Sequence, residues 1–425
     1  MSETIFALSS GQPPAGIAVI RISGPQAGGA LEALAGRLPE ARHARFARLR
    51  DSEGAALDDA LVLWLPGPGT ATGEDIAELH LHGGRAVIRA VEQALGAIAG
   101  LRQAEPGEFT RRAFTNGRID LAEAEGLADL LTAETDLQRR SALAMAGGML
   151  SRQVEGWRDG LLTLAARVEA VLDFADEDDV AALPEDFTRQ LGALADEIGI
   201  WLARPHAEVL KEGYRVVLAG PPNAGKSTLF NALVESEAAI TSPTAGTTRD
   251  VILRPVALGG VPFTFVDTAG LRGDSGDAVE AIGIDRARAE LDRADCVLWL
   301  GPERQGPQGA WEIEAQADRA GHAAKAAPHH RVSAVTGEGL EALKTALIDT
   351  ARQAMPRPGE AALNARQHAL LGEVHAALAG AQGEGDPLIQ AEHLRLGRLA
   401  LDRLVGRATT EDMLDALFGR FCIGK

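Results

Sequence analysis

The sequence predicts a multidomain protein of mixed α+β and α/β class, with an N-terminal α+β domain, a discontinuous helical bundle and an inserted α/β domain. Short β-like runs among Gly and Pro turns fill the first 117 residues. Long segments with few helix breakers begin at Asp120 and return after Pro358. Between them, from Tyr214, short apolar runs alternate with helical stretches, which is typical of a parallel sheet with crossover helices. With 425 residues, the chain is long enough for two or three domains.

The N-terminal part contains three runs that favour strands, at 16–22, 61–65 and 76–82. The helical part opens with a periodic apolar stripe whose spacing is 3-4-3-4-3, formed by Val154, Trp157, Leu161, Leu164, Val168 and Val171. This spacing places all six side chains on one face of a helix and indicates a packed core helix rather than a ligand site.

Helical patterning resumes at 363–378 and at 391–418, after the α/β segment. Helices before and after an α/β unit suggest one bundle that is built from two chain segments and interrupted by an inserted domain. We therefore expect four segments, at 1–118, 119–210, 211–352 and 353–425.

The net charge is −18, from 42 basic and 60 acidic residues, so the molecule as a whole repels nucleic acid. An RNA contact would need a partner protein or a local basic face, for which the candidates are Arg111, Arg112, Arg139, Arg140, Arg395, Arg398, Arg403 and Arg407. Ordinary solvated or paired arginines are the equal alternative. No signal-peptide pattern, membrane span or cysteine framework is evident, so we expect a cytoplasmic protein without a membrane anchor.

The strongest motif is YRVVLAGPPNAGKST at 214–228, which matches G-x-x-x-x-G-K-[ST] between an apolar run and a helix start. It predicts a phosphate-binding loop in which backbone N–H groups surround phosphate oxygens. Lys226 would contact the β- and γ-phosphates, and the Ser227 hydroxyl would ligate Mg²⁺. Asn223, Ala224, Gly225 and Thr228 complete the expected nucleotide contacts.

Two further motifs favour a GTPase. Thr248 in GTTRD lies 22 residues after Lys226, where a loop threonine can complete the Mg²⁺ shell. Asp267, Thr268, Ala269 and Gly270 form DTAG after an apolar run.

The position after DTAG departs from the Ras-type pattern. Leu271 stands where Ras-type proteins carry the glutamine that orients the attacking water. Glu280 is a candidate for that task, and a solvated carboxylate at a helix start is the alternative.

The guanine-binding motif is degenerate. No N-K-x-D tetrad follows the strand that contains Cys296; the nearest segment, AQAD at 315–318, keeps Asp318 but has Ala315 and Gln316. SAVTGEGL, with Ser333, Ala334 and Val335, looks like the loop whose backbone reads the guanine carbonyl. We expect guanine preference, weakened by the missing residues.

Taken together, these motifs resemble the MnmE (TrmE) family of tRNA-modification GTPases over essentially the whole length. The resemblance rests on GIAVIRISGP, ATGEDIAELHLHGG, PGEFTRRAFTNGRIDLAEAEGLADL, the inserted GPPNAGKST, GTTRD and DTAG motifs, and the terminal FCIGK. It implies an N-terminal folate-binding and dimerisation domain, a discontinuous helical domain and an inserted G domain.

In function, the resemblance implies a homodimer that forms a heterotetramer with an FAD protein similar to MnmG (GidA). Family members add a carboxymethylaminomethyl or aminomethyl group to the wobble uridine (U34) of tRNA. The cofactors implied are GTP/GDP, Mg²⁺, K⁺ and a 5-formyl- or methylene-tetrahydrofolate. GTP hydrolysis would be activated by K⁺ through dimerisation of the G domains.

Matching positions carry the family's sites onto this chain. The K⁺ site falls on Asn223, Ser242, Thr244 and Thr247, the catalytic glutamate on Glu280, and the folate contacts on Arg21, Glu78, Arg118 and Lys425. The family often has Lys where this chain has Arg118. A K⁺ ion beside the phosphates would replace the charge of an arginine finger.

In the tail FCIGK, Cys422 is the fourth residue from the end. Prenylation is a poor explanation because Gly424 is not aliphatic. Either the tail is an unstructured end, or Cys422 takes a nucleophilic or redox part in modification near the folate site, as the resemblance implies. A ribosome-assembly or translation-switch GTPase without modification chemistry, and a binding module that has lost guanine recognition, are the rival functions.

Overall fold

The structure is a computed structural model that describes residues 3–173, 183, 186–235, 252–268, 288–322 and 324–424. The chain forms two compact units. The first contains residues 1–128 and 402–425, and the second contains residues 129–401. No helix within the described ranges is long and apolar enough to cross a membrane.

The first unit contains a six-stranded sheet with the order β3-β4-β5-β2-β1-β6. Neighbouring strands are antiparallel except β1 and β6, which are parallel. The strands are β1 Thr4–Leu8, β2 Ile17–Ser23, β3 Arg45–Arg50, β4 Ala56–Leu65, β5 Ile76–His82 and β6 Leu101–Gln103. The predicted strand at 76–82 is confirmed, and those at 16–22 and 61–65 correspond to β2 and to the end of β4.

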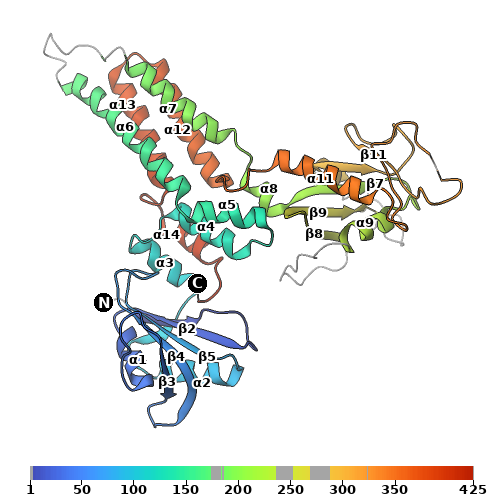
Figure 1. Cartoon of the computed structure of the whole chain (residues 1–425). Coiled ribbons are helices and arrows are strands. Elements are labelled where there is room, and N and C mark those ends of the chain that lie inside the picture. Colours follow the sequence, from blue (N-terminus) through green and yellow to red (C-terminus); the bar gives the residue numbers. More distant parts are fainter. Residues whose placement is uncertain are drawn as a thin grey trace, which may run out of the picture. The chain divides into compact units, whose positions relative to one another are not determined.

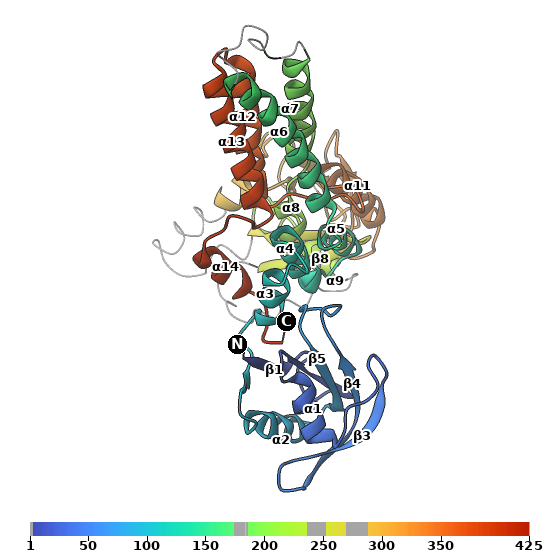
Figure 2. The same cartoon turned by 90° about the vertical axis from the view of Figure 1, so that its left-hand side faces the viewer.

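Alternation along these strands separates two faces of the sheet. On β2, Ala18, Ile20 and Ile22 are buried in a core that also contains residues of α1 (Ala27–Ala35) and α2 (Arg85–Gly96). Both helices therefore pack on that one face (Figure 2). Arg21 alternates with these residues along β2 and therefore lies on the other face of the sheet.

The C-terminal segment packs within the same unit. Leu414 and Phe418 of α14 (Glu411–Phe418) form a buried cluster with Phe421 and with Leu121, the first residue of α4 (Leu121–Thr132). Phe418 also contacts Phe114 of α3 (Glu108–Thr115), with ring centroids 6.0 Å apart. The end of the chain is thus part of the N-terminal unit by apolar burial.

In the second unit, long helices run side by side (Figure 1). All six residues of the predicted stripe are buried on α6, which confirms the core helix. The Trp157 ring meets the ring of Trp201 of α7 edge-on, with centroids 5.6 Å apart. The helices are α5 Asp136–Ala146, α6 Met149–Asp173, α7 Phe187–Leu202, α8 Ala207–Glu212, α12 Ala365–Gly383 and α13 Pro387–Leu404.

The helical pattern predicted over 391–418 is interrupted in the structure. Helix α13 ends at Leu404, and α14 begins at Glu411. Gly406 has φ +85°, and its N–H donates to the carbonyl of Arg403, as at a glycine C-terminal cap.

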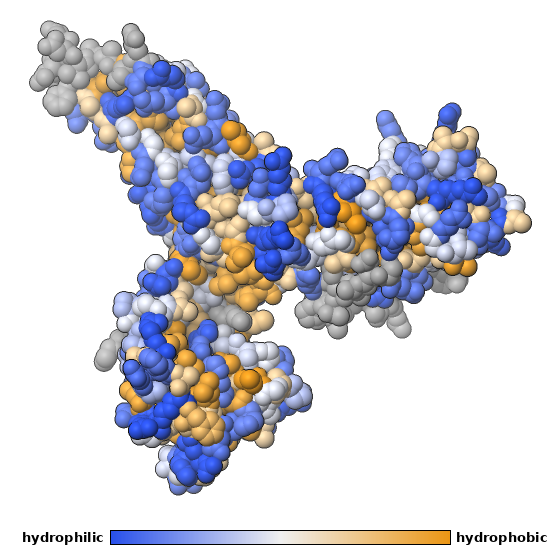
Figure 3. Space-filling model, in the orientation of Figure 1, coloured by the Kyte–Doolittle hydropathy of each residue, from blue (hydrophilic) through white to orange (hydrophobic). Residues whose placement is uncertain are grey.

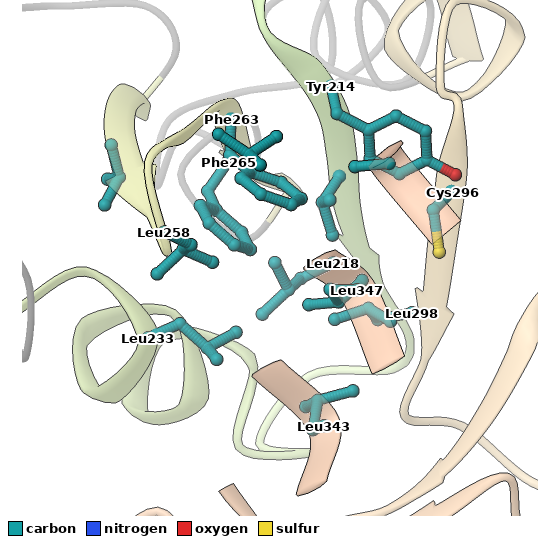
Figure 4. Packing of buried hydrophobic residues seen from close by; sticks show 14 of the residues in the cluster. Tyr214, Leu218, Leu233, Leu258, Phe263, Phe265, Cys296, Leu298, Leu343 and Leu347 are labelled. Carbon is teal, nitrogen blue, oxygen red and sulfur yellow. The ribbon is translucent and has the colours of Figure 1, made fainter. Parts of the chain in front are cut away.

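The inserted α/β segment forms a second six-stranded sheet, in the order β12-β11-β10-β7-β9-β8. All its neighbours are parallel except the β8–β9 hairpin. Its elements are β7 Tyr214–Ala219, α9 Lys226–Glu235, β8 Ile252–Leu258, β9 Val261–Asp267, β10 Cys296–Trp299, β11 Trp311–Glu314, β12 His330–Arg331 and α11 Leu340–Ala354. Figure 4 shows Leu218, Phe265 and Leu298 from the sheet packed toward Leu343 and Leu347 of α11.

One crossover in this sheet lacks a helix. Parallel strands β10 and β11 are joined by 300–310, which contains no helix, although such connections usually contain one. The Trp299 ring occupies space against this loop, since a Cβ on Gly301 or Gly306 would lie 2.4 or 2.6 Å from it.

Along strand β11, which follows this connection, apolar and acidic residues alternate between the two faces of the sheet. Trp311 and Ile313 pack on the core, whereas Glu312 and Glu314 are bound by polar groups. Lys325 Nζ donates to Glu312 across 2.6 Å, and His322 Nε2 contacts Glu314 at 2.8 Å. The hydrogen bond from His322 lowers the pKa of Glu314. Salt bridges here hold the loops beside β11.

Candidate functional site

The phosphate-binding loop connects β7 to α9. The helix begins at Lys226, three residues before the apolar run that suggested its start. Gly220, Asn223 and Gly225 have positive φ angles of 150°, 60° and 89°. Such a turn lets successive N–H groups converge on an anion, as the sequence motif predicts.

Lys226 and Ser227 are both held inside this site. Lys226 is buried, and its Nζ donates to the loop carbonyls of Gly220 and Pro221 across 3.0 and 2.8 Å. The Ser227 hydroxyl donates to Asp267 Oδ2 across 2.7 Å, which joins α9 to the end of β9. A hydroxyl and a carboxylate this close are hard oxygen donors of the kind that Mg²⁺ prefers, so these residues fit that ion.

A cavity of about 1220 Å³ opens over the loop. Besides the loop, it is lined by Thr268 at the end of β9, by Trp299, and by Gln316 and Arg319 after β11. The volume exceeds the range of about 300–1,000 Å³ usual for small-molecule sites, so a nucleoside triphosphate has room. Trp299 and Arg319 belong to no motif in the sequence and were not predicted to line this site.

A second cavity, of about 360 Å³, adjoins the first and contains the predicted guanine-binding residues. Asp318, Ala334 and Val335 line it, and the Ser333 hydroxyl donates to Asp318 Oδ1 across 2.6 Å. This hydrogen bond lowers the pKa of Asp318. The carboxylate is therefore ionised at neutral pH and can accept N–H groups of a base.

Several predicted site residues lie outside the described part of the chain. These are Ser242, Thr244, Thr247 and Thr248, then Ala269, Gly270, Leu271 and Glu280, and finally Lys425.

On the N-terminal sheet, Arg21 of β2 and Glu78 of β5 are partners in the strand register. Arg21 Nη2 donates to Glu78 Oε1 across 2.8 Å, and His80 Nε2 lies 3.3 Å from Glu78 Oε2. Burial opposes ionisation of Glu78, but the hydrogen bonds and charge of Arg21 outweigh it and lower the pKa of Glu78. Arg118 donates from Nε to the carbonyl of Thr70 across 3.1 Å.

The C-terminal tail is packed against the N-terminal domain. Phe421 and Gly424 are buried, and Ile423 forms a backbone bridge with Pro106. Gly424 has φ +92°, and a Cβ there would lie 2.0 Å from the carbonyl oxygen of Leu8, at the end of β1. This packing contradicts an unstructured end for 421–424, and it leaves the Cys422 thiol exposed.

At least five of the predicted arginines are paired with carboxylates among the residues that the structure describes. Their partners are Glu411 and Asp415 for Arg111, Glu74 and Glu108 for Arg112, Asp136 for Arg139 and Arg140, and Glu392 for Arg395. Local charge is therefore largely balanced, which favours the paired-arginine alternative over a basic face.

Comparisons with known proteins show the family to which the chain belongs. The family description "MnmE helical domain" matches residues 121–422, and "GTP-binding protein TrmE N-terminus" matches residues 4–118. The chain is 67% identical over 423 residues to "tRNA modification GTPase MnmE" of Erythrobacter litoralis, and 65% identical over 437 residues to the protein of that name from Novosphingobium aromaticivorans. In both comparisons all of this chain and all of the relative are covered.

Among solved structures, the G domain of the T. maritima FeoB iron transporter is 26% identical, with 32% of this chain and 98% of that chain covered and a TM-score of 0.23. The full-length relatives and the two family matches identify the family. The chain belongs to the MnmE family of tRNA modification GTPases.

Proposed function

We propose that this chain hydrolyses GTP and couples the hydrolysis to modification of the wobble uridine (U34) of tRNA with a carboxymethylaminomethyl or aminomethyl group. A GTPase of tRNA modification follows from the family membership. The observation that carries the nucleotide part is the adjoining pair of cavities, one over Lys226 and Ser227 and the other over Asp318. We also propose that the chain consists of an N-terminal domain at 1–118, a helical domain in two parts at 119–210 and 353–425, and a G domain at 211–352.

At the nucleotide, Lys226 would exchange its loop carbonyls for the β- and γ-phosphates, which offer it a full charge. Ser227 and Thr248 would hold Mg²⁺, and Asn223, Ser242, Thr244 and Thr247 would hold K⁺. When bound, these cations neutralise the charge that develops on the phosphates.

The attacking water would be positioned by Glu280. Its carboxylate can accept a hydrogen bond from water, which Leu271 cannot do. Asp318 would accept two N–H groups of guanine, which adenine does not present in that arrangement.

At the N-terminal sheet, Arg21, Glu78, Arg118 and Lys425 would bind a 5-formyl- or methylene-tetrahydrofolate as the one-carbon donor. Arginine suits the glutamate carboxylates of the folate, and a carboxylate such as Glu78 can accept hydrogen bonds from a pterin edge. The packed tail supports a role for Cys422 there: Gly424 meets Leu8, whose register partner Ile20 precedes Arg21.

Assembly would use the N-terminal sheet for homodimer formation. Its open face bears exposed apolar side chains, among them Ile17 at 64% and Phe46 at 70% exposure, and Leu61 is the register partner of Phe46. Figure 3 shows hydrophobic residues gathered over this sheet. We propose that the dimer joins an FAD protein similar to MnmG in a cytoplasmic heterotetramer. Because the arginines named above are largely paired, that partner would hold most of the tRNA.

Mass analysis of wobble nucleosides from cells that lack this chain tests the function. We expect the modified uridine to disappear and to return with the wild-type chain. Cys422→Ser should fail to restore it while the purified variant hydrolyses GTP normally, because the thiol is remote in sequence from the phosphate loop. An unchanged nucleoside profile would instead support a ribosome-assembly or translation-switch GTPase.

A further inference from the structure

Gln316 is the residue that replaces the lysine of the guanine motif, and it lies between the two nucleotide cavities. Its side chain lines both the cavity over the phosphate loop and the smaller cavity that contains Asp318. Arg319 lines both as well. These two side chains therefore lie between the part of the proposed site that would hold the phosphates and the part that would hold the base.

The Gln316 side-chain amide is hydrogen-bonded to the phosphate loop. Its Nε2 donates to the main-chain carbonyl of Asn223 across 3.2 Å. Asn223 is the non-glycine residue of this loop that has a positive φ, 60°, so the direction of its carbonyl depends on that turn. A hydrogen bond to this carbonyl stabilises the turn that aims the loop N–H groups at phosphate.

The Asn223 carbonyl and the Arg319 guanidinium favour the same orientation of the Gln316 amide. Arg319 Nη1 donates to Gln316 Oε1 across 3.2 Å, and a guanidinium can only donate. The carbonyl of Asn223 can only accept, so Nε2 must face it. Reversing the amide would break both hydrogen bonds.

Gly225 makes the approach possible. A Cβ at this position would lie 3.1 Å from Gln316 Nε2 and 3.3 Å from its Cγ. The glycine of the phosphate motif thus has a second use in this chain, because it gives the Gln316 side chain room to reach the loop.

We propose that Gln316 is a positioning residue that holds the phosphate loop in its anion-binding conformation from the base side, and that Arg319 orients its amide. This inference rests on the proposed GTP site and adds to it. The chain thereby keeps, with a neutral amide, a connection between base pocket and phosphate loop, so the loss of lysine from the motif does not disconnect them.

The test compares nucleotide binding by full-length variants. Fluorescent GDP would be titrated into the wild-type protein and into Gln316→Ala, Gln316→Lys and Gln316→Glu. Losing one hydrogen bond should weaken binding by roughly five- to tenfold in the alanine variant. Lysine can donate to the same carbonyl and should stay within about threefold of wild type. Glutamate should bind more weakly than alanine, because its oxygen would face the Asn223 carbonyl.

Inosine diphosphate (IDP) distinguishes a positioning role from recognition of the base. Its base lacks the exocyclic amine from which Asp318 would accept a hydrogen bond. Gln316→Ala should weaken GDP and IDP by the same factor, whereas Asp318→Asn should change the GDP:IDP ratio. Gln353→Ala, an exposed glutamine on α11, is the matched control and should bind as wild type does. Thermal unfolding of each variant checks that it is folded.

The outcomes separate the inference from the proposed function. If wild type binds no GDP, the proposed nucleotide site is wrong. If wild type binds GDP but Gln316→Ala binds equally well, the positioning role is wrong. A folded Gln316→Lys variant as weak as alanine, or an alanine variant with an altered GDP:IDP ratio, would also overturn it.

Discussion

Ser227 and Asp267 are joined by a hydrogen bond of 2.7 Å that connects the first turn of α9 with the C-terminal end of β9. The two residues are 40 positions apart and belong to different motifs. The parallel pairing of β7 with β9 brings the ends of both strands to one edge of the sheet, where the phosphate loop also begins. In the proposed nucleotide site, that edge is where a cation and the phosphates would meet.

Removing the Ser227 hydroxyl should slow GTP hydrolysis strongly without unfolding the domain. Ser227→Ala should lower kcat/KM for GTP by on the order of 100-fold, because a metal ligand would be lost. Ser227→Thr keeps a hydroxyl at the same place and should retain most activity. Steady-state phosphate release at saturating Mg²⁺ measures both, and an active alanine variant would contradict the metal role.

Breaking the pair between Arg21 and Glu78 should affect both stability and folate binding. The side chains are 28% and 17% exposed, so Arg21→Ala leaves a half-buried carboxylate without its main partner. We expect a cost of about 1–3 kcal/mol in the free energy of unfolding, measured with urea. Calorimetry should show loss of 5-formyl-tetrahydrofolate binding.

Arg48 is the matched control for that experiment. It forms a cross-strand pair with Asp59 on the same sheet, but its side chain is 58% exposed. Arg48→Ala should leave both stability and folate affinity unchanged, because exposed ion pairs contribute little. Equal effects of the two variants would show that burial and position do not distinguish Arg21.

A side chain at Gly424 should detach the tail. The Cβ of Gly424→Ala would lie 2.0 Å from the Leu8 carbonyl oxygen, and φ +92° disfavours any residue with a Cβ. We expect this variant to lose tRNA modification in cells while the purified protein keeps its GTPase rate. Gly385→Ala, where a Cβ has no neighbour within 4 Å, is the control. Normal modification by the Gly424 variant would argue against a role for tail docking.

Acid should weaken the first unit through Glu108. Burial opposes ionisation of this carboxyl, but hydrogen bonds from Arg102, the Glu105 N–H and Arg112 lower its pKa from 4.5 to about 2. The folded state therefore binds this proton less readily than the unfolded state. The stabilisation is complete above about pH 4.5 and is lost as the pH falls toward 2.

Urea midpoints at pH 7, 4.5 and 3 would measure this loss. Glu108→Gln should reduce stability at pH 7 and flatten the acid dependence, because glutamine does not titrate. Glu53→Gln, at an exposed turn position, should follow the wild-type curve. A Glu108 variant with the wild-type pH slope would contradict the assignment.

The sequence by itself determined the elements that depend on local periodicity and local backbone chemistry. The phosphate loop was evident from Gly220 to Ser227 because eight neighbouring residues specify both the turn and the helix that follows. The stripe on α6 and the strand at 76–82 were evident because their side chains alternate with the period of the element.

The tertiary structure alone decided which distant residues meet. The Gln316 amide reaches Asn223, 93 positions away, and the tail glycine reaches Leu8, because strand order and helix packing bring these backbones together. The sequence pattern predicted crossover helices throughout this sheet and therefore missed the connection without a helix between β10 and β11. A local signal was present, because the alternation of Trp311, Glu312, Ile313 and Glu314 indicates a strand with one polar face. Local sequence patterns indicate which face of a helix or strand is apolar. Only the tertiary packing of the chain determines which residues contact its polar face.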